Sequence, residues 1–250
     1  MIKVAKVLLL AGTSEAAEIA AALVGRRDVA VQASMAGATR APRDLGVPMR
    51  LGGFGGEDAF RDYLTEQGIE IVVDATHPFA TRISTRTAKV CAEMGVGYVL
   101  VQRPGWTPQA GDRWHFVDTM EQIRKIVPPA SRVFLATGRN TLQKFEILND
   151  CRILCRVIDP PRDPFPFAHG RFVVGRPPFS VAQEIAFFTQ ERIDWIVVKN
   201  SGGSRSESKL VAARQLGLPV ILINRTPPPD CTVVETVDDC LRWLDDRLAK

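Results

Sequence analysis

The chain has 250 residues, of which 32 are Lys or Arg and 28 are Asp or Glu, so its formal net charge is +4. With 46% hydrophobic and 24% charged residues, the composition is that of a globular protein and excludes disordered and fibrous classes. The length suits one large domain or two small ones. So small a net charge does not indicate a duplex nucleic acid as partner, although basic side chains can still gather opposite an acidic ligand.

The cysteine and histidine patterns indicate a reducing compartment and no metal centre. The five cysteines include no Cys-x-x-Cys pair, and Cys151 and Cys155 share a predicted strand, which favours core packing over a disulfide or a zinc site. The three histidines are not at ligand spacing. The first apolar run, Val7 to Ala11, is too short for a signal-peptide core or a membrane span. We therefore expect a cytoplasmic protein without membrane or nucleic-acid partners.

Short Val, Ile and Leu runs alternate with amphipathic stretches in the first part of the chain, which predicts βαβ units and a parallel sheet. The expected strands are Lys6–Ala11, Val29–Ala33, Pro48–Leu51, Glu70–Val73 and Tyr98–Val101. The expected helices are Ser14–Val24, Glu57–Gln67 and Phe79–Met94.

The same rhythm restarts after Arg103-Pro-Gly-Trp-Thr-Pro108. Further strands are expected at Arg132–Ala136, Ile153–Val157, Arg171–Val174, Asp194–Val198 and Pro219–Ile223, and helices at Thr119–Ile126, Ser180–Glu191, Ser206–Leu216 and Val237–Leu248. Pro104–Gly111 is the expected hinge. We therefore predict an α/β protein of two Rossmann-like parallel-sheet halves, residues 1–104 and 105–250, with a cleft between them.

Ligands of parallel α/β sheets bind beyond the carboxyl ends of the strands, and the first two strand ends suit an anion. Gly12 permits a tight turn, and Thr13 or Ser14 can cap a helix whose N–H groups face a phosphate. By itself this turn fits a plain capped strand-to-helix connection equally well. After the second strand, no Asp or Glu occurs between Asp28 and Asp44 to hold the ribose of NAD, whereas Ser34, Thr39 and Arg40 suit a 2′-phosphate.

The next two strand ends carry a glycine-rich loop and a histidine. Gly52-Gly53-Phe54-Gly55-Gly56 indicates close backbone approach, either to a ligand or to another loop. In Asp74-Ala75-Thr76-His77-Pro78-Phe79-Ala80, Thr76 or His77 can cap a helix with Pro78 at its first position. His77 would then lie at the sheet edge, as a ligand contact or as a structural hydrogen-bonding group.

Basic and small residues follow the strands of the second half. They are Gly138-Arg139-Asn140, Gly175-Arg176, and Lys199-Asn200-Ser201-Gly202-Gly203 with Lys209 beyond. This set predicts a polyanionic ligand facing the second half, although ordinary surface charges would give a similar pattern. The last segment lacks the P-loop pattern.

Taken together, these motifs resemble the precorrin-6A reductase family of cobalamin biosynthesis. The resemblance rests on Gly12–Glu15, Ser34–Gly37, Gly52–Gly56, Asp74–Ala80, Arg103-Pro104 with Trp106, Gly138-Arg139, Val198–Gly203, Ser208–Arg214 and Leu216–Val220. These blocks span nearly the whole chain in the family's order. Two departures are Arg176-Pro177-Pro178-Phe179, where the family more often has Arg-Gly-Pro-Phe, and Ala38, where an Arg often precedes the Thr.

The resemblance implies an NADPH-dependent reductase that converts precorrin-6A, a polycarboxylate tetrapyrrole, into precorrin-6B. The expected cofactor-binding residues are Gly12, Thr13, Ser14, Glu15, Ser34, Gly37, Arg40, Gly53, Phe54, Gly55, Thr76, His77 and Phe79. The expected substrate-binding residues are Arg139, Arg176, Lys199, Asn200, Ser201, Gly202 and Lys209. His77 and Lys199 are candidate proton donors, with water held in the cleft as an equal alternative.

Three other functions would make different demands on the same residues. A short-chain dehydrogenase or epimerase needs Tyr-x-x-x-Lys, but Tyr63 and Tyr98 are each followed four residues later by Gln. A glycosyl transferase is disfavoured by the missing acidic ribose anchor. A non-catalytic NADP-binding module or redox sensor would share the first-half loops but would not need the basic loops of the second half.

Overall fold

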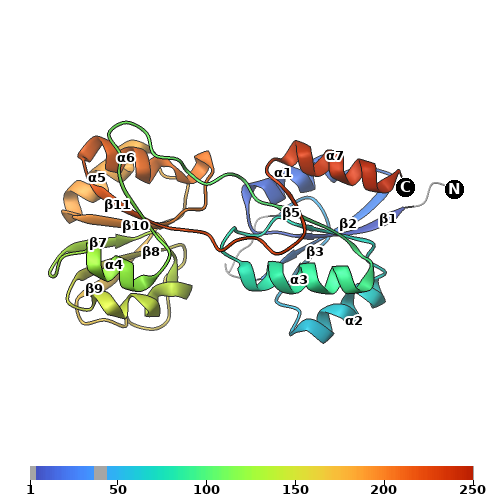
Figure 1. Ribbon diagram of the computed structural model, residues 1–250, viewed down its shortest axis with the longest axis horizontal. Coiled ribbons are helices and arrows are strands. Elements are labelled where there is room, and N and C mark those ends of the chain that lie inside the picture. The colour runs from blue at the N-terminus through green and yellow to red at the C-terminus, as the bar shows by residue number, and fades with distance from the viewer. Residues whose placement is uncertain (1–3, 37–43, 250) are drawn as a thin grey trace. The chain divides into compact units, whose positions relative to one another are not determined.

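The computed structural model describes residues 4–36 and 44–249, which form two compact units (Figure 1). The first unit combines Met1–Arg103 with Thr226–Lys250, and the second is Pro104–Arg225. The sequence placed everything after residue 104 in the second half. The structure corrects this expectation, because the C-terminal segment returns to the first unit.

The first unit is a six-stranded parallel sheet with helices on both faces. Its elements are β1 (Ala5–Leu10), α1 (Ser14–Leu23), β2 (Val29–Met35), β3 (Met49–Leu51), α2 (Glu57–Gln67), β4 (Ile71–Asp74), α3 (Thr81–Met94), β5 (Gly97–Val101), β12 (Thr232–Val234) and α7 (Val237–Leu248). The strand order is β12-β5-β4-β1-β2-β3. With β12 in sixth place, this is the 3-2-1-4-5-6 order of dinucleotide-binding sheets.

Successive side chains of β1 point to opposite faces of the sheet and contribute to the two hydrophobic cores of this unit. Val7 and Leu9 face one layer, where α1 and α7 lie side by side. Leu8 and Leu10 face the other layer, which α2 and α3 cover. Because a central strand is buried on both faces, it reads as a continuous apolar run.

The second unit repeats the architecture. Its elements are β6 (Arg113–Val117), α4 (Met120–Ile126), β7 (Arg132–Leu135), the 3₁₀ segment η1 (Arg139–Leu148), β8 (Arg152–Val157), β9 (Gly170–Val174), α5 (Val181–Glu191), β10 (Trp195–Lys199), the 3₁₀ turn η2 (Ser204–Ser206), α6 (Ser208–Leu216) and β11 (Pro219–Ile223). Its six strands are all parallel, in the order β6-β11-β10-β7-β8-β9.

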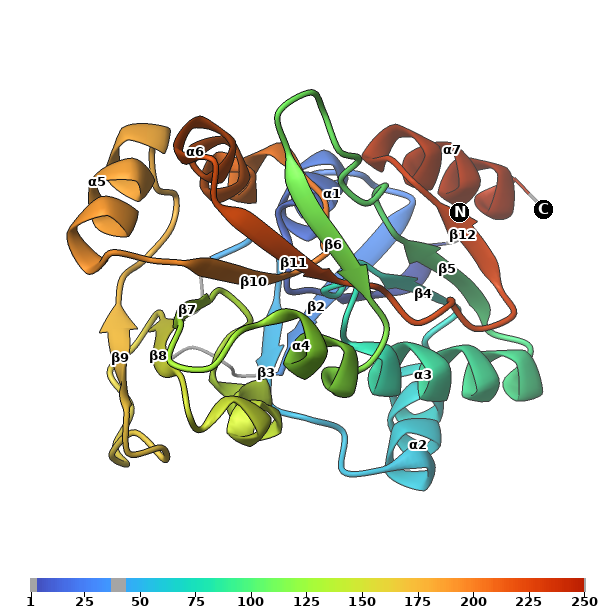
Figure 2. The same cartoon turned by 60° about the vertical axis from the view of Figure 1, so that its left-hand side comes forward.

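The two sheets exchange their outermost strands. β6 follows β5 along the chain but pairs with β11, and β12 follows β11 but pairs with β5 (Figure 2). Neither strand was predicted from the sequence. β6 is a largely exposed edge strand and β12 has only three residues, so neither carries the buried apolar run by which the other strands were recognised.

The predicted fold class is confirmed, and the predicted strands and helices match the observed ones to within a few residues at each end. Two local differences concern the site. Helix α3 begins at Thr81 rather than Phe79, because residues 77–80 form a turn in which Ala80 N donates to His77 O at 2.7 Å. The 3₁₀ segment η1 follows β7 where no helix was expected.

Candidate functional site

The strand order reverses between β1 and β4, and ligands of such sheets bind at this switch point. The loops after the two strands lie together there: a Cβ added to Gly12 would lie 3.9 Å from His77 N and 4.0 Å from Thr76 Cα. The structure therefore brings Gly12, Thr76 and His77 together at one point of the sheet edge.

Thr13 ties these two strand ends together. Its hydroxyl donates to Ala75 O at 2.8 Å and accepts from Ala16 N at 3.2 Å, which makes it the N-cap of α1. With one N–H satisfied by the cap, other N–H groups of the first turn remain directed outward from the helix. Of the two residues expected as caps, Thr13 is the one that caps the helix. The Ser14 hydroxyl instead donates to Glu15 Oε2 at 3.2 Å.

Glu15 is in the first turn of α1 and forms an ion pair with Arg103, Nη1 to Oε2 at 2.6 Å. Burial raises the pKa of Glu15, but hydrogen bonds from its own backbone N–H and from Arg103 outweigh this, so the pKa lies below its ordinary value. The sequence predicted Glu15 as a cofactor contact. In the structure its carboxylate is engaged by Arg103, whose role the sequence left open.

A buried carboxylate supports the loop after β4. Asp74 is fully buried and accepts hydrogen bonds from Thr76 N at 3.0 Å, Thr76 Oγ1 at 2.7 Å and Tyr98 Oη at 2.9 Å. Burial and the adjacent Asp74 raise the pKa of Tyr98, so its hydroxyl stays protonated as a donor. Three donors replace the water that a buried carboxylate loses, and they fix the position of Thr76.

His77 is exposed at the sheet edge, and Phe79 N donates to its Nδ1 at 3.2 Å. The His77 and Phe79 rings lie 5.9 Å apart. An accepting Nδ1 carries no proton, so this geometry selects the neutral imidazole with its proton on Nε2. In this contact Nδ1 is the acceptor, so Nε2 is the ring nitrogen that can donate a hydrogen bond.

A pocket with about 340 Å³ of space open to solvent lies beside this histidine. It is lined from the carboxyl-edge loops of β4 and β5, from the start of α3, and from the returning segment of the chain. The lining residues are Thr76, His77, Pro78, Thr81, Ser84, Thr85, Leu100, Val101, Gln102, Thr226, Pro227, Pro228 and Pro229.

The glycine-rich loop after β3 is held by Arg50, which the sequence analysis did not single out. Arg50 donates from Nη1 to Ser34 Oγ and Gly52 O, both at 2.9 Å, and from Nη2 to Gly53 O at 3.1 Å. Its guanidinium carbon lies 3.9 Å from the centre of the Phe54 ring. Phe54 is itself buried and packs on Phe60, so its ring anchors the loop.

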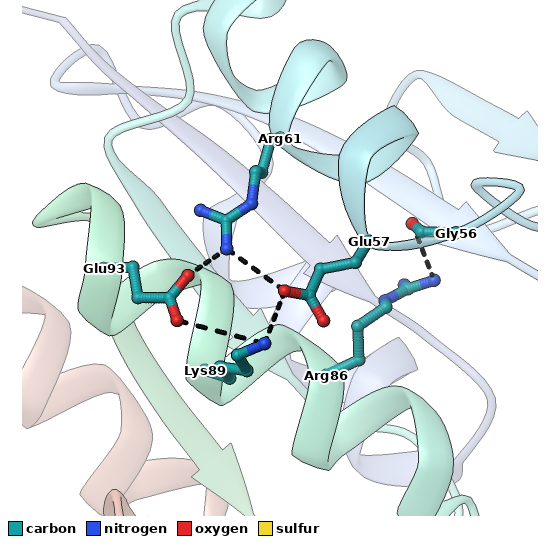
Figure 3. A network of polar contacts seen from close by, with 6 residues as sticks. All are labelled: Gly56, Glu57, Arg61, Arg86, Lys89 and Glu93. Carbon is teal, nitrogen blue, oxygen red and sulfur yellow. Dashed lines mark hydrogen bonds and ion pairs between the residues drawn. The ribbon is translucent and has the colours of Figure 1, made fainter.

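An ion-pair network joins α2 to α3 below this loop (Figure 3). Arg61 pairs with Glu57 and Glu93, and Lys89 bridges the same two carboxylates, at 2.7 Å from Glu57 and 4.0 Å from Glu93. Arg86 lies beside the network and donates to Gly56 O at 3.5 Å. These contacts support the far end of the glycine-rich loop. Two other predicted cofactor contacts, Gly37 and Arg40, lie outside the described residues.

In the second unit, the predicted basic residues follow parallel strands of one sheet and therefore belong to one edge. Arg139 follows β7, Arg176 follows β9 and Lys199 ends β10. Arg139 and Arg176 are exposed. Thr137, which the sequence analysis missed, is buried at the switch point between β7 and β10, and its hydroxyl has no hydrogen-bond partner within the described part of the chain.

Asn200 and Gly202 shape the loop after β10. Asn200 Oδ1 accepts from Trp106 N at 2.8 Å, and Trp106 Nε1 donates to Gly203 O at 3.2 Å. Gly202 has φ +65°, and a Cβ there would lie 1.9 Å from Pro104 O. Asn200 and Gly202, which were predicted as substrate contacts, therefore hold residues 104–106 against the loop. Trp106, which the sequence analysis grouped with Arg103-Pro104, takes part in these contacts.

The two lysines differ in their surroundings. Lys199 is partly buried, and burial together with Lys144 lowers its pKa. Lys209 lies with its amine 5.7 Å from the centre of the Trp106 ring, near the buried ion pair of Arg156 with Glu184. Burial lowers the pKa of Lys209 to about 8, even though Glu184 opposes this shift.

Within residues 4–36 and 44–249, no helix is both long and apolar enough to cross a membrane. No group of three or more His, Cys, Asp or Glu side chains is placed to hold a metal ion in that part of the chain.

Comparison with known proteins decides the family. A family model described as "Precorrin-6x reductase CbiJ/CobK" matches residues 6–245. The chain belongs to this family. A relative from Rhodobacter capsulatus named precorrin-6A reductase is 41% identical over 242 residues, 96% of each chain. One from Rhodococcus erythropolis with the same name is 40% identical over 96% of this chain and 97% of its own.

Structural comparison agrees with the sequence relatives. A solved structure described as "CobK precorrin-6A reductase" superposes with a TM-score of 0.91 at 41% identity, covering 97% of this chain and 96% of that chain. A more distant relative from Priestia megaterium, 28% identical over 95% of this chain and 97% of its own, is named cobalt-precorrin-6A reductase. The resemblance noted in the sequence is confirmed: this member of the precorrin-6x reductase family is a reductase, which excludes the non-catalytic alternative.

Proposed function

We propose that the protein uses NADPH to reduce one ring double bond of precorrin-6A, giving precorrin-6B in corrin biosynthesis. The observation that supports the coenzyme assignment is the strand order of the first unit, which places a capped helix at the switch point. Beside the second strand lies the cation of Arg50 rather than an acidic group. The substrate assignment follows from the family.

The residues at this edge fit a dinucleotide. Helix α1 presents its first turn at the switch point, where a diphosphate would accept N–H hydrogen bonds. Thr76 and His77 lie opposite Gly12 and would meet the nicotinamide end. Bound nicotinamide would supply the hydride, while the protein's own residues orient the ring and keep water away.

The basic edge of the second unit suits the carboxylates of a tetrapyrrole. Arg139 and Arg176 are exposed and Lys199 is partly buried, and Arg176 already pairs with the Asp159 carboxylate at 3.4 Å. Such cations suit the carboxylates of the substrate. Asn200 and Gly202 act in this proposal by shaping the loop that carries Ser201, rather than by direct contact.

Reduction also needs a proton, and Lys199 suits this role better than His77. A neutral imidazole that accepts at Nδ1 is a weak acid. A lysine ammonium whose pKa is lowered by burial is a stronger acid than one in water. We therefore propose that Lys199 provides the proton and that His77 donates a hydrogen bond from Nε2.

Of the two macrocycles, we favour cobalt-free precorrin-6A over cobalt-precorrin-6A as the substrate. Relatives 37–41% identical to this chain are named precorrin-6A reductase, whereas those named cobalt-precorrin-6A reductase are 28–29% identical. Initial rates with each macrocycle test this choice. A higher kcat/KM for the cobalt form would contradict it.

The decisive experiment titrates the purified protein with NADPH and then measures NADPH oxidation with precorrin-6A. We expect binding of NADPH and turnover that forms precorrin-6B. Arg139→Ala and Lys199→Ala should weaken macrocycle binding without changing NADPH affinity, and Lys199→Ala should also lower kcat. Glu66→Ala, at an exposed position of α2, is a suitable surface control. Turnover that does not consume NADPH would refute the proposal.

A further inference from the structure

We infer that Arg50 is the cation that recognises the 2′-phosphate of NADPH and sets the preference over NADH. This inference rests on the proposed function and names the residue that gives it coenzyme specificity. Arg50 and Ser34 are register partners on the adjacent strands β3 and β2. In sheets of this order the adenosine ribose lies beyond the end of the second strand, so a group added at its 2′ position would lie beside Arg50.

The guanidinium of Arg50 is held in place before any ligand binds. Its Nη1 donates to Gly52 O and Ser34 Oγ, and its Nη2 donates to Gly53 O. Its face rests on the Phe54 ring at 3.9 Å and lies 5.2 Å from the Tyr63 ring. A cation that is already oriented loses little conformational entropy on binding.

The other edge of this guanidinium is available. Arginine has five N–H donors, and Arg50 uses three in the contacts described above. The Nε–H and the second Nη2–H have no partner among the described residues, and these two form the side-on pair that binds a phosphate with two parallel hydrogen bonds. No carboxylate of the described residues pairs with Arg50, so its charge is not neutralised.

Arg86 provides a matched comparison in the same unit. It also donates to the glycine-rich loop, at Gly56 O, and lies 4.7 Å from the Phe60 ring. However, it belongs to α3, and its hydrogen bond goes to Gly56 rather than to Ser34 of β2. If the arginines only support the loop, replacing either one should affect NADPH and NADH alike.

The test measures dissociation constants of NADPH and NADH for the wild type, Arg50→Met, Arg50→Lys and Arg86→Met, by fluorescence of the bound nicotinamide. Arg50→Met should raise the NADPH constant about 10- to 100-fold, the range expected for losing charged hydrogen bonds, while NADH stays within about twofold. Arg50→Lys should fall between these values, because it keeps the charge without the paired donors. Unchanged NADH binding also shows that the variant is folded.

Competition by adenosine 2′,5′-bisphosphate against adenosine 5′-monophosphate isolates the extra phosphate. The wild type should favour the bisphosphate, and Arg50→Met should not. Equal weakening of both coenzymes by Arg50→Met, or loss of the preference in Arg40→Ala but not in Arg50→Met, overturns the inference and leaves the proposed function standing. If the wild type binds neither coenzyme, the proposed function and the inference both fail.

Discussion

Arg103 and Glu15, 88 positions apart in the chain, meet in an ion pair of 2.6 Å at the start of α1. The pair places an arginine against the one acidic side chain in the first turn of the helix that faces the proposed diphosphate. Without its partner, the Glu15 carboxylate would repel that anion. We therefore interpret Arg103 as a neutralising residue.

This interpretation predicts a rescue. Arg103→Met should weaken NADPH binding about 5- to 20-fold, because it leaves an uncompensated charge near the phosphates. Adding Glu15→Gln should recover most of the affinity, and Glu15→Gln alone should strengthen binding, because it removes the negative charge that offsets the Arg103 cation near the phosphates. Titration of the two single variants and the double variant measures the coupling. A double variant as weak as Arg103→Met would contradict the interpretation.

The same pair predicts a pH dependence of stability. The pKa of Glu15 is below its ordinary value of 4.5 in the folded protein. The stabilisation is therefore fully present above that value and is lost as the pH falls through the folded pKa. Glu15→Gln should cost about 1–2 kcal/mol of unfolding free energy at pH 7, and the difference should shrink below about pH 4. Denaturant unfolding at several pH values checks this, and a difference that grows in acid would refute it.

Gly202 and Gly217 provide a matched pair for the loop after β10. Both have φ +65°, but a Cβ at Gly217 meets nothing within 4 Å, whereas one at Gly202 would lie 1.9 Å from Pro104 O. Gly217→Ala should cost about 1 kcal/mol for the left-handed backbone alone. Gly202→Ala should cost at least about 2 kcal/mol more, within the range seen for overpacking. Urea unfolding measures both, and similar costs would mean that the loop shifts freely.

Helix α7 should stabilise the first unit specifically. Leu244 is fully buried among side chains of the first sheet, and Leu244→Ala should cost about 2–4 kcal/mol. Hydrogen exchange should show faster exchange in β4 and β5 and no change in β7 and β10. Arg242→Ala, on the same helix with a side chain 71% exposed, should leave both units unchanged. Faster exchange confined to the second unit would contradict the division of the chain.

Lys209→Met should stabilise the protein at neutral pH. The pKa of Lys209 is lowered from 10.5 to about 8, so the unfolded chain binds more protons between these values and stability rises with pH across that range. Removing the buried ammonium should add about 1–3 kcal/mol at pH 7, and the gain should decrease toward pH 10. The Tm of both proteins from pH 7 to 10 tests this; a loss of stability at pH 7 would contradict it.

Much of the architecture was predictable because each unit buries its central strands on both faces. β1, β4, β7 and β10 each contain an uninterrupted run of at least three buried apolar residues, and glycines and caps mark where the helices between them begin and end. The edge strands β6 and β12 carry no such signal, and their exchange between the sheets depends on contacts between distant segments. A local pattern does not contain that information.

The candidate site was predictable where a residue's role depends on its place in the loop. Gly12, Thr13 and Thr76 lie together because the strand order brings their loops together. Arg50 was missed because its role depends on lying beside Ser34 in the sheet, sixteen positions away. Glu15 and Asn200 were predicted as ligand contacts from their motifs, but tertiary partners that no local pattern reveals engage both side chains.

The strand exchange also sets the order in which the protein can be completed on the ribosome. The second unit is one continuous stretch, Pro104–Arg225, and emerges whole before β12 and α7 are made. The first unit begins earlier but lacks β12 and α7 until the segment after Arg225 has been made. The first unit is therefore completed after the second, and until β12 emerges its β5 edge stays open to pairing with other nascent chains.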